Sequence, residues 1–305
     1  MKRCLFKREI DGWASWGRVF QCIEAFEPLI ADIFVRHGLT YETISNLTPG
    51  TNAVFLAGAY VVKIFAPAQS GIIPDTAELS GIRHALDVGV AAPKIICHGV
   101  INDRYDFPYL VMEHIEGIEA GDKIHALPGG EKQAFAAAIR ALTDKLNVPY
   151  KGTGIADNVA ENARVNTRWD VFPPALKSEV MEKASALSSD SFVYVHGDLT
   201  GENVLITEDG GIRVIDFGDS HIAPASYEWP PLILELFRCD PILIRAFLGR
   251  EPDNDMIETL TQAVMIHDFG AGFVRDLCHR TGAKYETVLT SGNIAAMMRR
   301  VLAVQ

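Results

Sequence analysis

Two loops rich in oxygen-bearing side chains follow short apolar runs in the second half of the chain, and they constrain the fold more than any other feature. The first loop, residues 196–203, reads His-Gly-Asp-Leu-Thr-Gly-Glu-Asn, and the second, residues 216–219, reads Asp-Phe-Gly-Asp. Short apolar runs bounded by turn residues predict strands. The pattern therefore predicts that Asp198, Asn203 and Asp216 lie on loops at strand ends.

These three side chains form the set that phosphoryl transfer requires. One carboxylate, here Asp198, can orient a hydroxyl group and accept its proton, while an asparagine and a second aspartate, here Asn203 and Asp216, can hold Mg²⁺ against nucleotide phosphates. The same residue types also occur in ordinary turns, where they bond to the local backbone. The Asp-Phe-Gly sequence that begins thirteen residues beyond Asn203, after a separate predicted strand, favours the catalytic interpretation.

A lone charge interrupts an apolar run earlier in the chain. Lys63 stands within Val-Val-Lys-Ile-Phe at residues 61–65. Burying a lysine is costly unless it is paired, so the alternative is a lysine at an edge or on an outward face. Glu78 follows fifteen residues later on a predicted helix, 75–87. A strand lysine held by a helix glutamate and directed at the α- and β-phosphates of a nucleotide is the arrangement in kinases.

Two further segments are candidate nucleotide-binding segments because of their positions relative to Lys63. Gly50, Thr51 and Asn52 form a turn one short hairpin before it, and such a turn can present backbone N–H groups to phosphate, although most turns of this composition are only turns. The apolar run 108–115 can offer backbone groups to adenine, while an ordinary buried strand fits its side chains equally well.

The periodicity of apolar residues divides the chain into a β-rich first third and a mostly helical remainder. Residues 1–40 are predicted to be helical. They precede predicted strands in 43–65, 92–100 and 109–112, later helices at 131–146, 176–187 and 231–248, and three short strands within 192–215.

The chain is acidic, and its charge is unevenly distributed. The net charge is −11, and residues up to Glu113 carry ten basic and twelve acidic side chains, against 18 and 27 after it. Nucleic-acid phosphates favour basic surfaces, which argues against a nucleic-acid partner. A second part rich in carboxylates would instead attract a small cationic ligand.

The cysteines and the lengths of the apolar runs argue against a disulfide-rich, a zinc-binding or a membrane protein. The five cysteines are scattered and show no metal-ligand spacing, so neither a disulfide framework nor a zinc site is predicted. No apolar stretch approaches the length of a membrane span, and no apolar segment follows the basic residues of the N-terminus. These features predict a cytoplasmic protein that does not associate with a membrane.

The motifs, in their order and spacing, resemble those of the aminoglycoside phosphotransferase and choline-kinase-like superfamily, and their pattern is most similar to antibiotic kinases of the hygromycin B type. The resemblance extends from about Thr48 to the C-terminal helices. It implies an α+β, two-lobed protein-kinase-like fold. The small β-rich N-terminal lobe, with a helical extension, would comprise residues 1–113, and the larger, mostly helical C-terminal lobe would comprise residues 114–305.

The resemblance also implies roles for individual residues and cofactors. The nucleotide donor would be ATP, with GTP as the alternative, together with Mg²⁺. Many members carry Gly-Asp shortly after the Asp-Phe-Gly loop, but the corresponding stretch here, 222–225, has no acidic residue. By resemblance, Asp198 is the catalytic base, Asn203 and Asp216 bind Mg²⁺, Gly50, Thr51, Asn52, Lys63 and Glu78 form the phosphate site, and Glu113 and Ile115 contact adenine through their backbones.

The function expected from these features is ATP-dependent phosphorylation of a hydroxyl group on an aminoglycoside-type antibiotic, an activity that confers antibiotic resistance. Asp219, Glu228 and Asp268 are the candidate carboxylates for a cationic acceptor. The alternative is a metabolite kinase of the same fold that acts on choline, homoserine, a glycated amine or a sugar. The protein is expected to be a monomer or a homodimer.

Two other classes fit the sequence less well. A protein kinase needs a long activation loop, but only about a dozen residues separate Asp216 from Glu228, and no Ala-Pro-Glu follows. A pseudokinase that only binds partners is disfavoured because Lys63, Glu78, Asp198 and the two predicted metal ligands are all present.

Overall fold

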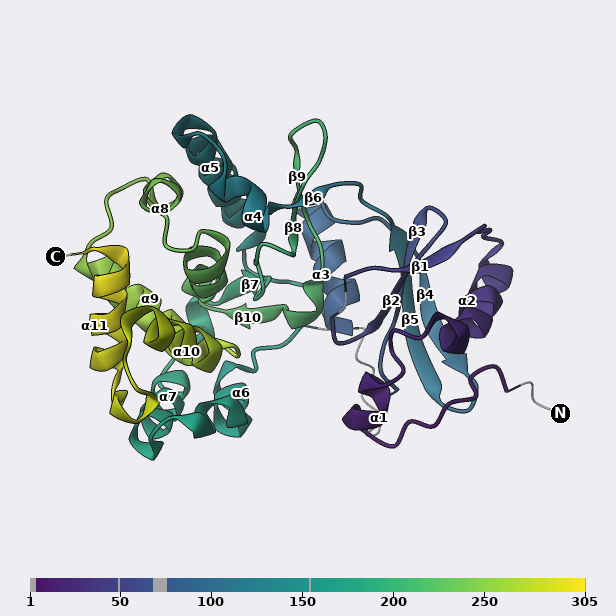
Figure 1. The fold of residues 1–305 in the computed structure, drawn as a ribbon, viewed down its shortest axis with the longest axis horizontal. Coiled ribbons are helices and arrows are strands. Elements are labelled where there is room, and N and C mark those ends of the chain that lie inside the picture. Colours follow the sequence, from purple (N-terminus) through teal and green to yellow (C-terminus); the bar gives the residue numbers. More distant parts are fainter. Residues whose placement is uncertain (1–3, 49, 68–75, 154, 305) are drawn as a thin grey trace. The chain divides into compact units, whose positions relative to one another are not determined.

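The structure is a computed structural model that describes residues 4–48, 50–67, 76–153 and 155–304. The chain divides into two compact units, one formed by residues 1–82 and 92–116 and the other by residues 83–91 and 117–305 (Figure 1). The predicted division into functional lobes at residue 113 remains a prediction. Within the described ranges, no helix combines the length and apolar character needed to cross a membrane.

The first unit is built on a five-stranded antiparallel sheet. The strand order is β1-β2-β3-β5-β4. Short connections join β1 to β2, β2 to β3 and β4 to β5, and the turn between β2 and β3 uses Gly58 with φ of +60°. The strands are β1 (Ile44–Asn46), β2 (Ala53–Ala57), β3 (Tyr60–Ile64), β4 (Ile95–Asn102) and β5 (Asp106–Glu113).

Two helices that precede the sheet in sequence supply much of the first unit's core. They are α1 (Trp13–Gly17) and α2 (Ile23–His37), and α2 packs along the sheet (Figure 1). Residues at helical spacing on α2 are buried because they form one apolar stripe. The ring of Phe26 lies 5.5 Å from that of Phe55 in β2, and the ring of Phe6 lies 4.9 Å from that of Phe107 in β5. The N-terminal segment is therefore part of this hydrophobic core.

Helix α3 (Thr76–Asp87) carries Glu78 in its first turn, as predicted. Its first residues belong to the first unit and its last turn belongs to the second. Asp75, the predicted first residue of this helix, lies outside the described residues.

The second unit is mostly helical. Helices α9, α10 and α11 pack against one another (Figure 1). Its α-helices in the described ranges, besides the end of α3, are α4 (Ala120–His125), α5 (Gly129–Leu146), α6 (Val159–Val165), α7 (Pro174–Ser185), α8 (Pro241–Leu248), α9 (Asn254–Ile266), α10 (Gly270–Thr281) and α11 (Ser291–Leu302). Short 3-10 helices cover Thr167–Val171, Ser189–Ser191, Phe217–Asp219, Ala225–Glu228 and Tyr285–Thr287, and a π-helix covers Pro231–Leu236.

The three strands predicted within 192–215 are present, but they belong to two different sheets. Strand β7 (Val193–Val195) pairs with β10 (His221–Ala223), whereas β8 (Val204–Ile206) lies between β6 (Ile118–Glu119) and β9 (Ile212–Val214). Strands β6 and β10, of two and three residues, were not predicted from the sequence.

The prediction of one helix over 231–248 is wrong. The π-helix ends at Leu236, and Arg238 and Cys239 then take left-handed backbone angles, with φ of +48° and +64°. Helix α8 starts afresh after Asp240, whose carboxylate accepts the N–H groups of the first turn. The reason lies in Asp240-Pro241, since proline suits the first position of a helix and disfavours helical backbone in the residue before it.

Candidate active site

Gly197 brings the two acidic loops of the second unit together. Its φ is +82°, and a Cβ at this position would lie 2.4 Å from the carbonyl oxygen of Asp219. Only glycine adopts this angle and leaves this space without strain. The loop that follows β7 therefore lies against the 3-10 turn Phe217–Asp219.

The carboxylate of Asp198 is held by Asn203. The Asn203 Nδ2 group donates to Asp198 Oδ2 at 2.8 Å and to the Asp198 carbonyl oxygen at 2.9 Å. Asn203 is buried, and its backbone carbonyl oxygen accepts the N–H of Ile215 at 3.0 Å. This bond links the loop to the end of β9. Because the amide nitrogen of Asn203 is used in this way, its side-chain oxygen is left to act as a ligand.

His196 is a structural part of the loop. Its side chain is fully buried, its Nε2 lies 3.1 Å from the carbonyl oxygen of Ile215, and its Nδ1 lies 3.2 Å from the N–H of Asp198. A carbonyl can only accept and an N–H can only donate, so these partners assign a neutral imidazole protonated on Nε2. His196 therefore fixes Asp198 relative to the strand that ends before Asp216.

Glu228 anchors the same loop from inside the unit. Its side chain is 1% exposed, and its carboxylate accepts the backbone N–H groups of His196 and of Gly197, the latter at 3.3 Å. The side chain of Asn147 donates to the same carboxylate at 3.3 Å. Burial raises the pKa of Glu228 to about 7, although these three hydrogen bonds favour its ionised form.

Carboxylates gather around Asp198. Burial, together with the neighbouring charges of Asp219, Glu235 and Asp216, raises the pKa of Asp198 to about 7. Asp216 has left-handed backbone angles, with φ of +59°, which is uncommon for a residue with a side chain. Strained backbone of this kind is often found at functional sites.

The donor set fits a divalent cation. The Asn203 amide oxygen and the Asp216 carboxylate are hard oxygen ligands of the kind that Mg²⁺ prefers, and a cation would relieve the repulsion that raises the pKa of Asp198. Among the described residues, no cluster of three or more His, Cys, Asp or Glu side chains is arranged to bind a metal alone. Phosphate oxygens and water would therefore complete the coordination, as is usual for Mg²⁺.

A pocket of about 540 Å³ opens beside Asp198, entirely within the second unit. Its acidic lining residues outnumber the basic ones. It is lined by Asp198, Thr200, Glu202, Leu234, Glu235, Arg238, Phe269, Gly272, Phe273, Asp276 and Arg280.

The wall of this pocket that carries Glu235 has an unusual backbone. Glu235 lies on the π-helix, and π-helical turns occur frequently at functional sites. Arg280 stabilises the irregular segment by donating to the carbonyl oxygen of Leu234 at 3.2 Å and to the sulfur of Cys239 at 3.5 Å. Arg280 also pairs with Asp276 at 2.6 Å, so its charge is largely neutralised within the pocket.

The first unit holds the predicted lysine–glutamate pair. Lys63 on β3 and Glu78 on α3 form an ion pair, and their side chains are 6% and 1% exposed. The pairing explains why a lysine is tolerated in an apolar strand, because a buried charge requires a partner. The alternative of an edge or outward-facing lysine is wrong, since β3 lies between β2 and β5 and the Lys63 side chain is buried.

The other predicted nucleotide residues of the first unit lie at strand ends. Gly50, Thr51 and Asn52 connect β1 to β2, and the carbonyl oxygen of Thr51 accepts the indole N–H of Trp16 at 2.8 Å. Glu113 is the last residue of β5, and Ile115 follows it. Their contacts with a nucleotide remain predictions.

Comparison with known proteins identifies the family. Residues 49–229, more than half of the chain, match the sequence profile of the phosphotransferase enzyme family. The chain belongs to this family. A comparison with curated proteins finds no significant match.

Solved structures of phosphotransferases have the same fold. The streptomycin–ATP complex of APH(2″)-IIa has a TM-score of 0.62 at 14% identity, covering 91% of this chain and 98% of that one. The GDP–kanamycin complex of APH(2″)-IIIa has a TM-score of 0.59 at 16% identity, with 90% and 98% covered. A choline kinase from Streptococcus pneumoniae has a TM-score of 0.56 at 16% identity, with 90% and 98% covered. The predicted α+β, kinase-like fold is confirmed.

The acids that line the pocket beside Asp198 differ from those predicted from the sequence. Asp219 is half-buried in the turn beside Gly197, and Asp268 accepts hydrogen bonds from Asn162 at 2.9 Å and His221 at 3.0 Å. Glu228 is buried beneath the loop, where its carboxylate accepts two backbone N–H groups, and we infer a structural role for it. None of the three is among the residues that line the pocket.

The acids that do line the pocket were missed. They are Glu202, Glu235 and Asp276, which come from three separate segments of the chain. Only Glu235 carried a signal, as a lone acid within the apolar run Pro-Pro-Leu-Ile-Leu-Glu-Leu-Phe at 230–237. A charge in such a run is costly unless it faces solvent or a site.

The raised pKa of Asp198 predicts a pH-dependent effect on stability. In the unfolded chain the Asp198 carboxyl loses its proton near pH 3.8, whereas in the folded chain it keeps the proton up to about pH 7. Raising the pH from 3.8 to 7 therefore lowers the free energy of unfolding, and the loss persists above pH 7. We expect Asp198→Asn to unfold at a higher temperature than the parent at pH 8 without divalent cations. The difference should shrink as the pH falls and vanish below pH 4.

Thermal unfolding followed at pH 4, 6 and 8 would test this expectation. Asp255→Asn is the matched control, because Asp255 is exposed on α9 and makes no side-chain hydrogen bond or ion pair among the described residues. An Asp198→Asn variant that is no more stable than the parent at pH 8, or whose advantage grows toward acid, would contradict it.

Proposed function

We propose that this phosphotransferase transfers the γ-phosphoryl group of ATP to a hydroxyl group of a small cationic molecule, with aminoglycosides as the first candidate acceptors. The observation that carries the proposal is the acidic pocket beside Asp198. Because Asp276 is paired with Arg280, the attraction for an ammonium group falls mainly to Glu202 and Glu235. The structures of relatives bound to kanamycin with GDP, and to streptomycin with ATP, support this substrate class.

In this proposal Asp198 orients the acceptor hydroxyl and takes its proton. Its Oδ2 is bonded to Asn203, so the other carboxylate oxygen is the one available to the hydroxyl. Proton acceptance requires the ionised form, which a pKa of about 7 makes available near neutral pH. His196 and Glu228 hold the loop so that little reorganisation is needed when the acceptor binds.

The remaining predicted residues would bind the nucleotide. Asn203 and Asp216 would hold Mg²⁺, which when bound neutralises charge on the phosphates. Lys63, oriented by Glu78, would contact the α- and β-phosphates. The backbones of Gly50, Thr51 and Asn52 would add phosphate contacts, and those of Glu113 and Ile115 would pair with adenine.

A metabolite kinase is the second candidate, and Arg238 favours one form of it. Arg238 lines the same pocket as Glu235, and its only described ion pair is with Asp122, whose side chain is 93% exposed. Such a surface pair contributes little, so Arg238 can exchange its partner. An acceptor with both an ammonium and a carboxylate group, such as homoserine, would engage Glu235 and Arg238 together.

A protein substrate fits less well, as the sequence indicated. The residues between Asp216 and Glu228 form a 3-10 turn, strand β10 and a second 3-10 turn, and β10 is paired with β7. This stretch is held within the fold and offers no long loop on which a peptide could lie.

A coupled ATP-turnover screen would test the proposed function. It should cover aminoglycosides, choline, homoserine and glycated amines, each with ATP and with GTP. Turnover with aminoglycosides alone supports the first candidate, and turnover with homoserine supports the second. Absence of turnover with every acceptor, together with no thermal shift on adding Mg-ATP, would contradict phosphotransfer itself.

Glu235 provides a test of how the acceptor is selected. We expect Glu235→Gln to raise the KM of a cationic acceptor about tenfold, since a hydrogen bond to a charged group contributes about 1.5–3 kcal/mol. The KM of the nucleotide should change little. The KM of the acceptor in the parent should also rise with salt, because the Debye length shrinks from about 10 Å at 0.1 M to about 3 Å at 1 M.

Steady-state kinetics at several ionic strengths would measure both effects. Glu182→Gln is the control, since Glu182 is an exposed acid on α7 outside the pocket. If the KM of a cationic acceptor changes neither with salt nor in Glu235→Gln, the carboxylates of the pocket do not select the substrate.

The Lys63–Glu78 pair provides a test of the nucleotide site. We expect Lys63→Ala to raise the KM of the nucleotide more than that of the acceptor, and Glu78→Ala to act in the same direction but less. Because the two side chains are in contact, their effects should not be additive.

A double-mutant cycle on the nucleotide KM and on unfolding stability would measure the coupling. The exposed pair Glu161–Arg164 on α6 is the control, and its coupling in stability should not exceed about 1 kcal/mol. Simple additivity for Lys63 and Glu78 would contradict the functional ion pair.

A further inference from the structure

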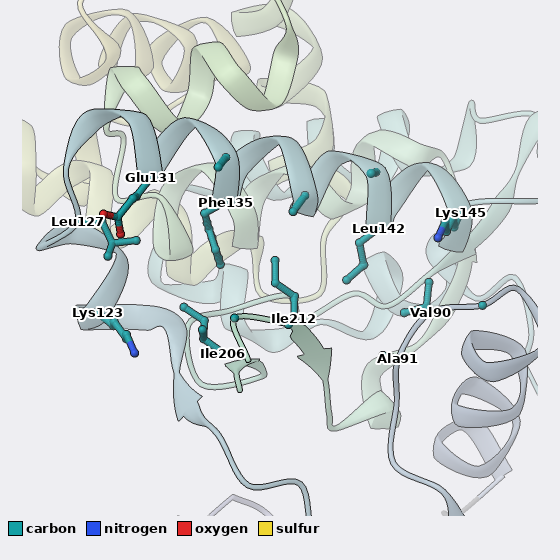
Figure 2. A pocket seen from close by; sticks show the side chains of 16 residues that line it. Val90, Ala91, Lys123, Leu127, Glu131, Phe135, Leu142, Lys145, Ile206 and Ile212 are labelled. Atoms are coloured by element: carbon teal, nitrogen blue, oxygen red, sulfur yellow. The ribbon is translucent and has the colours of Figure 1, made fainter. Parts of the chain in front are cut away.

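Helix α5 forms one wall of a second pocket in the second unit, which we call the α5 groove (Figure 2). Its volume is about 630 Å³, and it shares no lining residue with the pocket beside Asp198. Phe135 and Leu142 on α5 face Ile206 and Ile212 of the β8–β9 hairpin across it (Figure 2). Small residues on α5, which are Ala134, Ala138 and Ala141, leave the groove open along the helix.

The groove is positively charged at one end, although the chain is strongly acidic. Lys123 and Lys145 lie near its two ends (Figure 2), and neither forms an ion pair with any residue that the structure describes. Glu131 lies at the same end as Lys123 and offsets its charge (Figure 2). The end at Lys145 is therefore the more favourable place for an anionic group.

The hairpin also offers backbone hydrogen-bonding groups at this site. The N–H of Thr207 bonds to the carbonyl oxygen of Gly211 at 2.9 Å, and the N–H of Val214 bonds outward to the carbonyl oxygen of Ala91 at 3.0 Å. Since bonding directions alternate along an antiparallel strand, the N–H and C=O groups of Ile212 point away from β8, toward the same outer edge as Val214. Strand β9 is the edge of its sheet, and neither group of Ile212 has a backbone partner among the described residues on that edge.

We propose that the α5 groove binds a short extended segment of another protein, with apolar side chains at alternate positions and a carboxylate at the end near Lys145. The charge of Lys145 complements the carboxylate, and the free edge of Ile212 complements an extended backbone. The groove follows α5 from Glu131 to Lys145, which is about 21 Å at the rise of a helix, and six or seven extended residues span the same length. This site is independent of the proposed phosphotransfer.

Selection from a displayed library of random heptapeptides on the full-length chain would test the proposal. The selected peptides should be enriched in Asp or Glu together with alternating apolar residues, and their Kd should be measured by fluorescence polarisation. We expect Lys145→Glu to weaken binding about fivefold, as for an exposed ion pair, and Ala138→Trp to weaken it at least as much by filling the groove. Lys151→Glu, at an exposed lysine outside the groove, should change nothing.

Phosphotransfer activity of the groove variants should stay at the parent level, which also shows that they fold. No enrichment, or peptides that bind Lys145→Glu and Ala138→Trp as tightly as the parent, would overturn the proposal. Dodecanoate and glutamate would then be tested as competitors of the selected peptides. Dodecanoate is included because an acyl chain also combines an apolar body with one carboxylate. Displacement of the selected peptides by millimolar glutamate but not by dodecanoate supports a peptide site, and tighter binding of dodecanoate than of any peptide would overturn it in favour of a lipid.

Discussion

Replacing Asp198 with Ala is expected to lower kcat by about 10²–10⁴-fold while leaving the fold and the binding of Mg-ATP largely intact. The factor is the usual contribution of a positioned side chain that accepts a proton in the transition state. The fold should persist because Asp198 is only partly buried and its loop is also held by His196 and Glu228. Removing one of several mutually repelling carboxylates should not destabilise the unit above neutral pH.

Turnover kinetics and nucleotide titration would be measured together on this variant. Asp255→Ala is the matched control, because it removes an exposed aspartate that makes no side-chain hydrogen bond or ion pair among the described residues. A near-parental kcat in Asp198→Ala would remove the catalytic assignment, whereas loss of nucleotide binding with the fold intact would assign Asp198 to the nucleotide site.

Replacing Glu228 with Ala is expected to lower both stability and turnover. Two buried backbone N–H groups, those of His196 and Gly197, would lose their acceptor, and each unpaired group costs about 1–3 kcal/mol. The loop would then lose its fixed position, and a displacement of about 1 Å at a catalytic group can lower the rate about 10²-fold. The KM of the acceptor should change less than kcat, because Glu228 does not line the pocket.

Chemical denaturation and steady-state kinetics would separate the two effects. Glu228→Gln keeps one acceptor oxygen and should lie between the parent and Glu228→Ala, which keeps the test informative if the alanine variant does not fold. Glu182→Ala is the control for loss of an exposed acid. A Glu228→Gln variant that raises only the acceptor KM would instead restore the role first predicted from the sequence, direct contact with the substrate.

Local patterns in the sequence determined much of the fold and the core of the candidate site. The apolar period predicted helices α2, α3, α5 and α7 because burial of one helix face leaves a repeat of 3.6 residues. Asp198 and Asn203 were predicted together because a catalytic loop places them five residues apart on one turn, where the structure joins them by a hydrogen bond. Lys63 and Glu78 could be paired because a buried strand lysine requires a carboxylate.

Tertiary structure decided what lies around that core. Glu202, Glu235 and Asp276 line one pocket because three distant segments fold together, and nothing in the local sequence of each reports the other two. The local sequence gives no sign that Glu228 is buried. Tertiary packing places it beneath the loop, where it accepts backbone N–H groups that would otherwise be unpaired.

The N-terminal segment shows the same division between local and tertiary information. Its aromatic residues predicted helices, and only the folded unit shows that Phe6 and Phe26 complete the core under β2 and β5. Sequence periodicity indicates which face of a helix or strand is buried. The element that packs against that face depends on contacts between residues far apart in the chain. The sequence alone therefore determined most of the elements and the candidate catalytic motif, and the long-range packing decided the pocket beside Asp198 and the support of the loop that carries it.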